Sequence, residues 1–261
     1  MSITPSVSVM VAAYNEAATL EGAVSDALAA LDGVSDLEVI IVDDGSTDGT
    51  AEIADRLSIE QPGVRVIHHP VNRGIAAVYR TGLEAAMKQY FTWIGGDREI
   101  TAESMREVIQ AIGRADLVIP YHENPEARPW HRQMVTWLCT QQINVLFGWS
   151  LHYYQGPTVY PRELALQIPV ENQGFFFASE MLIRAMAMRL TWVEVGLCHQ
   201  ERQHGTTHAV KPIHLLSAQF SVLVLWLTLR LGLGRAAPQP SLGSVSNVGA
   251  IGDIKKKLGY D

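Results

Sequence analysis

The run from Leu37 to Thr50, which reads LEVIIVDDGSTDGT, constrains the fold of this chain more than any other segment. Its first part, Leu37–Val42, is mostly apolar and β-branched, a composition typical of a strand that is buried on both faces of a sheet. The strand ends abruptly at two carboxylates, Asp43 and Asp44, and a Gly-Ser turn follows them. A buried strand that turns directly into a helix is the repeating unit of a parallel α/β sheet.

The two adjacent acids have two interpretations. Ligands of open parallel sheets bind in the crevice at the carboxyl ends of the strands, where Asp43 and Asp44 would accept hydrogen bonds from a nucleotide base and its sugar hydroxyls. Alternatively, both acids only cap the turn into the next helix, whose N-cap we expect at Thr47 or Asp48. The run by itself leaves both interpretations open.

Strand-like and helix-like segments alternate along the first half of the chain. Further strands are expected at Val7–Ala12, Val64–His69 and Tyr90–Ile94. Helical stretches follow the first and second of these, to about Leu31 and about Gln89, and short polar connections join the elements. Polar residues follow three of the strand ends, and one shared site explains them better than independent caps. We therefore expect a mainly parallel sheet flanked by helices.

The motifs in these connections resemble those of family 2 glycosyltransferases with the GT-A fold. In chain order they read VSVMVAAYNE (residues 7–16), VDDGSTDGT (42–50), NRGIAAVYRTG (72–82) and GGD (95–97). The resemblance covers about residues 6–211 and is nearest to the dolichyl- or polyprenyl-phosphate sugar synthases. Two positions depart from the family pattern, because Ala13 replaces the usual proline before Tyr14 and Gly95 replaces the first acid of the usual D-x-D motif.

The resemblance implies a site for a nucleotide-sugar donor of the UDP or GDP type. Asp44 would read the base, and the backbone near Ala13 and Tyr14 would hold the nucleoside. An acid at a strand end accepts hydrogen bonds from uracil and guanine alike, so the identity of the base stays open. The residues assigned to donor binding by resemblance are Ala13, Tyr14, Glu16, Asp43, Asp44, Arg73, Gly74, Gly96 and Asp97.

By the same resemblance, Asp97 is the predicted metal ligand. The leaving diphosphate develops charge that Mg²⁺ or Mn²⁺ neutralises, and such ions need few protein ligands when phosphate oxygens supply the rest. Because Gly95 removes one acid of the usual motif, Glu99 is expected to substitute as a ligand, directly or through water. In the alternative interpretation, Asp97 lies in a surface turn and caps the helix expected at Ala102–Ile112.

The middle of the chain is expected to bind the acceptor. A strand at Asp116–Ile119 leads through a proline-containing loop into an amphipathic helix at Trp130–Phe147. In the resembling family, arginines at the start of the corresponding helix meet phosphates, a position that Arg132 matches best and that Arg128 lies close to. Guanidinium groups suit phosphate because they offer several donors and keep their charge. The alternative is a solvated helix end.

Two further segments complete the predicted phosphate and acceptor side. Gln155 and Gly156 lie in a turn that resembles the floor of the family's acceptor site. Glu180 is either a catalytic base for a sugar hydroxyl or a residue that orients Arg202 or a helix. A lipid phosphate is already ionised and needs a base less. After an edge strand expected at Thr191–Val195, Arg202 begins the segment RQHGTT and resembles the arginine that closes over the diphosphate.

The segment Leu215–Gly234 is mostly apolar, but it contains several polar residues and Arg230. A membrane-spanning helix needs about 20 predominantly apolar residues, so this segment is marginal as a span. We favour an interfacial helix on a membrane surface over a single span or an oligomer contact. The predicted organisation is a glycosyltransferase domain at 1–211, an apolar membrane-associating or packing helix at 212–234, and a flexible tail at 235–261.

Composition narrows the function further. The net charge of −7 argues against nucleic-acid binding as a main role. Two cysteines without a C-x-x-C motif fit a reducing compartment and argue against a zinc site. The first strand is expected within a few residues of Met1, which leaves no room for a signal peptide. We expect a cytoplasmic protein that is peripheral on the cytoplasmic face of a membrane.

Together these features predict an inverting, metal-dependent enzyme that transfers a hexose from a nucleotide sugar to a polyprenyl phosphate. One alternative is a soluble glycosyltransferase that acts on a sugar or small-molecule hydroxyl, with Glu180 as an essential base. Another is a non-catalytic nucleotide-sugar-binding protein. The apolar helix favours the lipid acceptor, because a soluble enzyme has no evident use for it, and it also allows a homo-oligomer.

Overall fold

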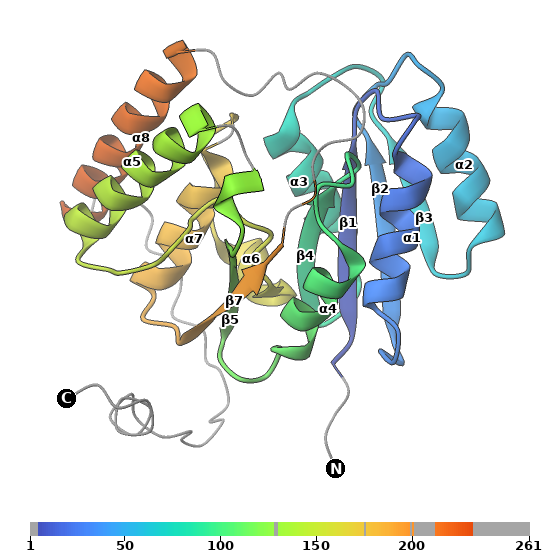
Figure 1. Ribbon diagram of the computed structural model, residues 1–261, viewed down its shortest axis with the longest axis horizontal. Coiled ribbons are helices and arrows are strands. Elements are labelled where there is room, and N and C mark those ends of the chain that lie inside the picture. Colours follow the sequence, from blue (N-terminus) through green and yellow to red (C-terminus); the bar gives the residue numbers. More distant parts are fainter. Residues whose placement is uncertain (1–4, 128–129, 175, 199, 201–211, 232–261) are drawn as a thin grey trace.

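The computed structural model describes residues 5–127, 130–174, 176–198, 200 and 212–231 (Figure 1). The strands are β1 (Val7–Ala13), β2 (Leu37–Asp43), β3 (Val64–His68), β4 (Tyr90–Gly95), β5 (Leu117–His122), β6 (Tyr160–Pro161) and β7 (Trp192–Leu197). The helices are α1 (Leu20–Ala30), α2 (Thr50–Glu60), α3 (Ile75–Ala85), α4 (Ala102–Gln110), α5 (Trp130–Phe147), α6 (Arg162–Gln167), α7 (Phe177–Ala187) and α8 (Pro212–Arg230), with a 3-10 turn at Pro125–Ala127. The first four predicted strands are confirmed to within one residue at the carboxyl end.

The main sheet has the strand order β3-β2-β1-β4-β6. Its first four strands are parallel, and the two-residue β6 pairs antiparallel with β4. β5 and β7 form a second, parallel pair, and an antiparallel bridge between Val118 and Val159 connects it to the segment before β6. The predicted α/β fold with a mainly parallel sheet is confirmed, and all four parallel strands end at the same edge.

Helices cover both faces of the main sheet, as the strand sequences require. Alternate side chains of a strand point to opposite faces, so Val9 and Val11 of β1 pack with α1, α2 and α4, whereas Met10 packs with α3, α6 and α7. β2 repeats the pattern, with Ile41 on the first face and Ile40 on the second. Because both faces are buried, these strands read as continuous apolar runs.

The N-cap predicted for α2 at Thr47 or Asp48 is wrong. The N-cap residue is Gly49, whose φ of 94° lies in the region that glycine adopts without a steric cost. Asp48 acts from one position earlier, where its carboxylate accepts hydrogen bonds from the backbone nitrogen of Thr50 at 3.1 Å and from the Thr50 hydroxyl. The acid therefore still satisfies a donor of the first helical turn.

α3 ends at Ala85, earlier than the predicted limit near Gln89. The backbone nitrogens that would have continued the helix donate instead to side chains of the first two strands or the residue before them. Met87 donates to Glu38 at 2.6 Å, and Lys88 and Gln89 donate to the hydroxyls of Ser8 and Ser6 at 3.1 and 3.0 Å. Contacts between distant parts of the chain thus override the local helical preference.

α5 and α8 pack against each other at one end of the molecule (Figure 1). α5 has the predicted bounds, and α8 overlaps the predicted apolar segment from Leu215 onward, whereas residues 232–234 lie outside the described part. Within the residues that the structure describes, no helix combines the length and apolarity that crossing a bilayer demands.

Candidate active site

Cross-links between loops organise the edge where the parallel strands end. The loop after β1 and the loop after β2 exchange hydrogen bonds, because Asn15 donates its backbone nitrogen to the Ser46 hydroxyl and accepts from the backbone nitrogen of Thr47, both at 2.9 Å. The backbone nitrogen of Glu16 donates to the Thr50 hydroxyl at 2.8 Å. Short Gly, Ser, Asn and Thr residues allow this close approach. These hydrogen bonds therefore hold the loops after β1 and β2 together.

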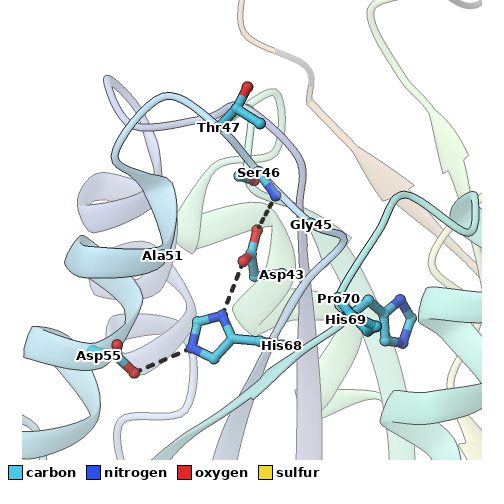
Figure 2. Close-up of a pocket in the computed structure, with 9 residues that line it drawn as sticks. All are labelled: Asp43, Gly45, Ser46, Thr47, Ala51, Asp55, His68, His69 and Pro70. Carbon is cyan, nitrogen blue, oxygen red and sulfur yellow. Dashed lines mark hydrogen bonds and ion pairs between the residues drawn. The ribbon is translucent and has the colours of Figure 1, made fainter.

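Asp43, the first of the adjacent acids, is buried at the end of β2. One carboxylate oxygen accepts from the backbone nitrogen of Ser46 at 3.2 Å, and the other lies 2.9 Å from Nδ1 of His68. The second ring nitrogen of His68 lies 3.1 Å from Asp55 on α2 (Figure 2). Burial lowers the pKa of His68, but hydrogen bonds and ion pairs with the two carboxylates outweigh it, so its pKa is raised.

Asp44, the second acid, anchors the loop that follows β3. Its carboxylate accepts from the backbone nitrogens of Arg73 and Gly74 at 2.9 and 2.8 Å and lies 2.6 Å from Nδ1 of His69. The other ring nitrogen of His69 lies 2.9 Å from the Thr81 hydroxyl. Asp44 is buried, and it holds the loop after β3 rather than capping its own turn. Its role in reading the base stays a prediction.

A hollow of about 400 Å³ opens on the α2 side of this edge (Figure 2). This volume is within the usual range of small-molecule sites. Asp43 lines the hollow, whereas Asp44 and Asp97 do not. Its lining residues are Asp43, Gly45, Ser46, Thr47, Ala51, Asp55, His68, His69 and Pro70.

The loop after β4 brings Gly96 and Asp97 to the same edge. Gly96 donates to the carbonyl oxygen of Ala12 at 2.8 Å, and a Cβ at this glycine would lie 3.1 Å from that oxygen and 3.6 Å from Glu16. A Cβ at Gly95 would lie 2.6 Å from Oδ1 of Asp97. The carboxylate of Asp97 therefore occupies the space that a side chain at position 95, the first acid of the usual D-x-D motif, would fill.

The interpretation of Asp97 as the cap of the next helix is wrong. α4 begins at Ala102, and its N-cap is Thr101, whose hydroxyl accepts from the backbone nitrogen of Ser104 at 3.1 Å. Asp97 instead accepts from the backbone nitrogen of Glu99 at 3.4 Å. The helix already has a cap, so helix capping does not explain the carboxylate at position 97.

The donor set around Asp97 fits a hard divalent cation. No cluster of three His, Cys, Asp or Glu side chains able to hold a metal occurs in the described part of the chain. Mg²⁺ and Mn²⁺ prefer oxygen ligands and retain positions for phosphate oxygens and water. Asp97 and Glu99 offer carboxylate oxygens two residues apart in one loop, a set that suits an ion bound jointly with a diphosphate.

On the acceptor side, Arg132 is half-buried in the first turn of α5. Gly156 packs closely on β5, since a Cβ there would lie 2.8 Å from the carbonyl oxygen of Pro120. Gln155 lines a small gap between α5 and α7, together with Ser179. The predicted phosphate ligands Arg128 and Arg202 lie outside the described residues.

Glu180 has four protein donors. One oxygen accepts from Arg184 Nε at 2.9 Å and lies 2.8 Å from Nη2, and the other accepts from the backbone nitrogens of Glu171 and Asn172 at 3.1 and 2.8 Å. The side chain is buried. The arginine that Glu180 contacts within the described residues is Arg184, on the same helix, whereas the predicted partner Arg202 lies outside them. The role of catalytic base stays a prediction.

A family model described as glycosyl transferase family 2 matches residues 8–168. The chain belongs to glycosyl transferase family 2. It is therefore a glycosyltransferase, and the predicted resemblance is confirmed, as is the GT-A class of its α/β fold. The match covers all four strand ends described above.

Similar proteins include the undecaprenyl-phosphate mannosyltransferase of Micrococcus luteus, 27% identical over 67% of this chain and 76% of that protein. The polyprenol monophosphomannose synthase of Mycolicibacterium smegmatis is also 27% identical, over 66% of this chain and 69% of that protein. Glucosyl-3-phosphoglycerate synthase from Mycobacterium tuberculosis, solved in complex with Mn²⁺, UDP and glucosyl-3-phosphoglycerate, has a TM-score of 0.64 at 20% identity and covers 92% of this chain and 82% of that chain. This last comparison shows the fold.

Sequence reasoning missed the two histidines that hold the acidic pair. His68 and His69 stand at the end of β3, beside β2 in the sheet. Their position as the last two residues of a predicted strand was the available signal, since neighbouring parallel strands end together. The pairing of each histidine with one acid depends on strand register, which a single sequence does not reveal.

Proposed function

We propose that this enzyme is an inverting, metal-dependent glycosyltransferase that moves a hexose from a UDP- or GDP-sugar to a polyprenyl phosphate. The observation that carries the proposal is the shared strand edge, where the backbone nitrogen of Gly96 hydrogen-bonds to Ala12 of β1, so that Asp97 follows beside the cross-linked loops. Two relatives named for the mannosylation of polyprenyl carriers support the acceptor.

In this proposal, the strand-end loops hold the donor. The backbone near Ala13 and Tyr14 holds the nucleoside and Asp44 reads the base. Asp97 and Glu99 hold Mg²⁺ or Mn²⁺, which when bound neutralises charge on the leaving diphosphate. The remaining donor contacts come from Glu16, Asp43, Arg73, Gly74 and Gly96. The preformed loops supply the positioning on which transfer depends.

The acceptor phosphate is held by Arg132, with Arg128 beside it and Gln155 and Gly156 beneath it. It attacks the anomeric carbon in line with the leaving diphosphate, which inverts the configuration there. Arg202 meets the diphosphate. Because a phosphate monoester is ionised at neutral pH, the reaction needs a cation to place it more than a base to activate it. The four donors around Glu180 support this division of roles.

The proposed location is the cytoplasmic face of a membrane, with the segment 215–234 lying in the interface. Polyprenyl phosphate resides in a bilayer, so the enzyme must reach the membrane surface. An apolar helix that lies in the interfacial plane supplies such an attachment. The 1–211 domain then carries the chemistry, and the tail after 234 plays no catalytic part.

A ligand panel followed by a transfer assay tests the proposal. Thermal shifts measured with UDP- and GDP-sugars in the presence of Mn²⁺ should reveal the donor, since a ligand that binds the folded state raises the apparent stability. The selected donor is then offered polyprenyl phosphate and, separately, soluble sugars with free hydroxyls. Transfer to the lipid phosphate is expected. Transfer to hydroxyl acceptors alone would replace the proposal with the soluble-enzyme alternative, and donor binding without turnover would leave a binding protein.

A further inference from the structure

α5 points its large apolar side chains toward solvent. Trp130 and Val145 are 70% and 80% exposed, and Trp137 is 59% exposed. Residues three or four apart share a helix face, so these side chains form one stripe with Met134 and Leu138 between them. The opposite face of α5 is apolar as well, since Cys139 and Ile143 are buried there and Leu146 packs against the main core. α5 is therefore apolar on both sides, unlike the usual amphipathic surface helix.

α8 shows the same pattern. Its exposed stripe continues from Phe220 through Leu223, Val224 and Leu227 to Leu231, one residue beyond the helix. The opposite face is also apolar, since Val222 and Leu225 are buried in the main core. A helix that is apolar on both faces and buries only one of them leaves the other without a partner among the residues that the structure describes.

The two stripes belong to adjacent helices. The indole nitrogen of Trp226 donates to the carbonyl oxygen of Leu146 at 2.6 Å, and the amide of Gln142 donates to the carbonyl oxygen of Gln219 at 3.3 Å. These polar contacts lie between the helices. The α5–α8 surface consists of Trp130, Met134, Trp137, Leu138, Val145, Phe220, Leu223, Val224, Leu227 and Leu231.

This clustering is not the ordinary scatter of apolar residues over a protein surface. Within the described residues, sixteen large apolar side chains are exposed, and the α5–α8 surface holds ten of them. Single exposed apolar residues are normal, whereas a contiguous patch marks a surface that meets a partner or a membrane.

The charges on the two helices indicate what the surface meets. The chain has 27 acidic residues and a net charge of −7, yet the sequences of α5 and α8 contain no Asp or Glu. Their arginines lie near the ends, with Arg132 in the first turn of α5 and Arg230 at the end of α8, above the ring of Trp226 at 5.4 Å. A tryptophan-containing apolar face on helices that carry arginines near their ends and no carboxylates matches the interface of an anionic bilayer.

We propose that the α5–α8 surface docks into the headgroup region of an anionic lipid bilayer, with α5 contributing as much as α8. Arg132, two residues after Trp130, lies on the other, half-buried side of the first turn of α5, so one side of α5 touches the membrane and the other reaches the phosphate of a lipid acceptor. The second part rests on the proposed function, whereas the docking itself rests on the exposed stripes. A second copy of this chain is the rival occupant, but its matching face offers no carboxylate to the arginines.

Flotation of the full-length protein with lipid vesicles, in the absence of donor and acceptor, tests the docking. Vesicles of phosphatidylcholine alone are compared with vesicles that also contain phosphatidylglycerol. The test variant is Trp137→Glu with Leu223→Glu, one change on each helix. Ile59→Glu on α2 is the matched control, since Ile59 is 84% exposed and lies away from this surface.

Wild type and Ile59→Glu should bind the anionic vesicles alike, and the double variant should bind about ten-fold or more weakly, because each change removes an apolar side chain from the bilayer and adds a charge. Equal binding by all three proteins would overturn the proposal, because attachment would then come from another part of the chain. A wild-type dimer in light scattering that the double variant dissolves, without vesicle binding by either, would also overturn it and assign the surface to a second copy.

A separate arm keeps the two proposals distinguishable. Transfer to a short-chain, detergent-dispersed polyprenyl phosphate does not require a membrane, so the double variant should retain wild-type turnover there if it is folded, as judged by its melting temperature. Lost vesicle binding with retained turnover supports both proposals. Vesicle binding by a protein that turns over no polyprenyl phosphate would support docking and reject the acceptor.

Discussion

The strand edge and the α5–α8 surface differ in which kinds of side chain they bury and which they expose. At the strand edge, charged groups are buried and have partners, as the three contacts of Asp44 and the two of Asp43 show. On the α5–α8 surface, large apolar groups are exposed. Buried charge must be satisfied within the protein, whereas exposed apolar area gains free energy from an outside partner. The strand edge therefore satisfies its charged groups within the protein, whereas the α5–α8 surface exposes apolar area that an outside partner would cover.

The largest expected effect comes from Asp97, the proposed metal ligand at the strand edge. Asp97→Asn should abolish transfer while the protein stays folded, because a neutral amide is a poorer ligand for a divalent ion and position 95 offers no second acid. Turnover and melting temperature are measured together. Undiminished transfer by this variant, or by the wild type in excess chelator, would reject the metal assignment.

A second variant tests whether Asp44, a buried acid at the strand edge, also contacts the nucleotide. Asp44→Ala leaves two backbone donors and His69 without an acceptor, so it should lower the free energy of unfolding by about 1–3 kcal/mol. If Asp44 also reads the base, binding of the free nucleoside diphosphate should weaken by a similar amount. Calorimetric titration on the folded variant measures the second effect. Normal nucleotide affinity with a lowered melting temperature would make Asp44 a loop anchor alone.

Arg132 and Glu180 test the acceptor side, because one stands in the first turn of α5, the helix that carries half of the α5–α8 surface, and the other is buried in α7. Arg132→Ala should lower turnover of polyprenyl phosphate at least ten-fold, about 1.4 kcal/mol or more in transition-state stabilisation. Glu180→Gln should cost less turnover, provided that the variant is folded. The reverse order would identify Glu180 as a base and favour a hydroxyl acceptor.

The smallest expected effect is a pH dependence of stability at His68. Its pKa is raised in the folded protein, so protonated His68 between Asp43 and Asp55 adds stability that is full below the unfolded-state pKa of about 6.5 and is lost as the pH rises through the higher folded value. His68→Gln should therefore lower the unfolding free energy most near pH 5.5 and least near pH 8.5, by about 0.2–1 kcal/mol for a partly exposed pair. Urea titrations at both pH values measure this. A deficit that grows with pH would contradict the assignment.

Local patterns in the sequence predicted most of the scaffold. The apolar runs gave the first four strands, and the helix at Trp130–Phe147 has the predicted bounds. The motifs at the strand ends gave the family, which the match to residues 8–168 confirms. These features could be predicted because strand burial, helix periodicity and turn chemistry depend on residues close together in the chain.

The sequence by itself determined which side chains stand at the strand ends, and tertiary structure decided what they do there. His68 and His69 reach the acidic pair only because β3 lies beside β2 in a particular register, and Glu180 meets the backbone of Glu171 and Asn172 only in the folded chain. The orientation of α5 is the clearest case. The sequence predicted an amphipathic helix, but both sides of α5 carry apolar side chains. Tertiary packing decided that Cys139 and Ile143 are buried while Trp130 and Trp137 stay exposed, because contacts between distant segments decide which face of a helix is buried.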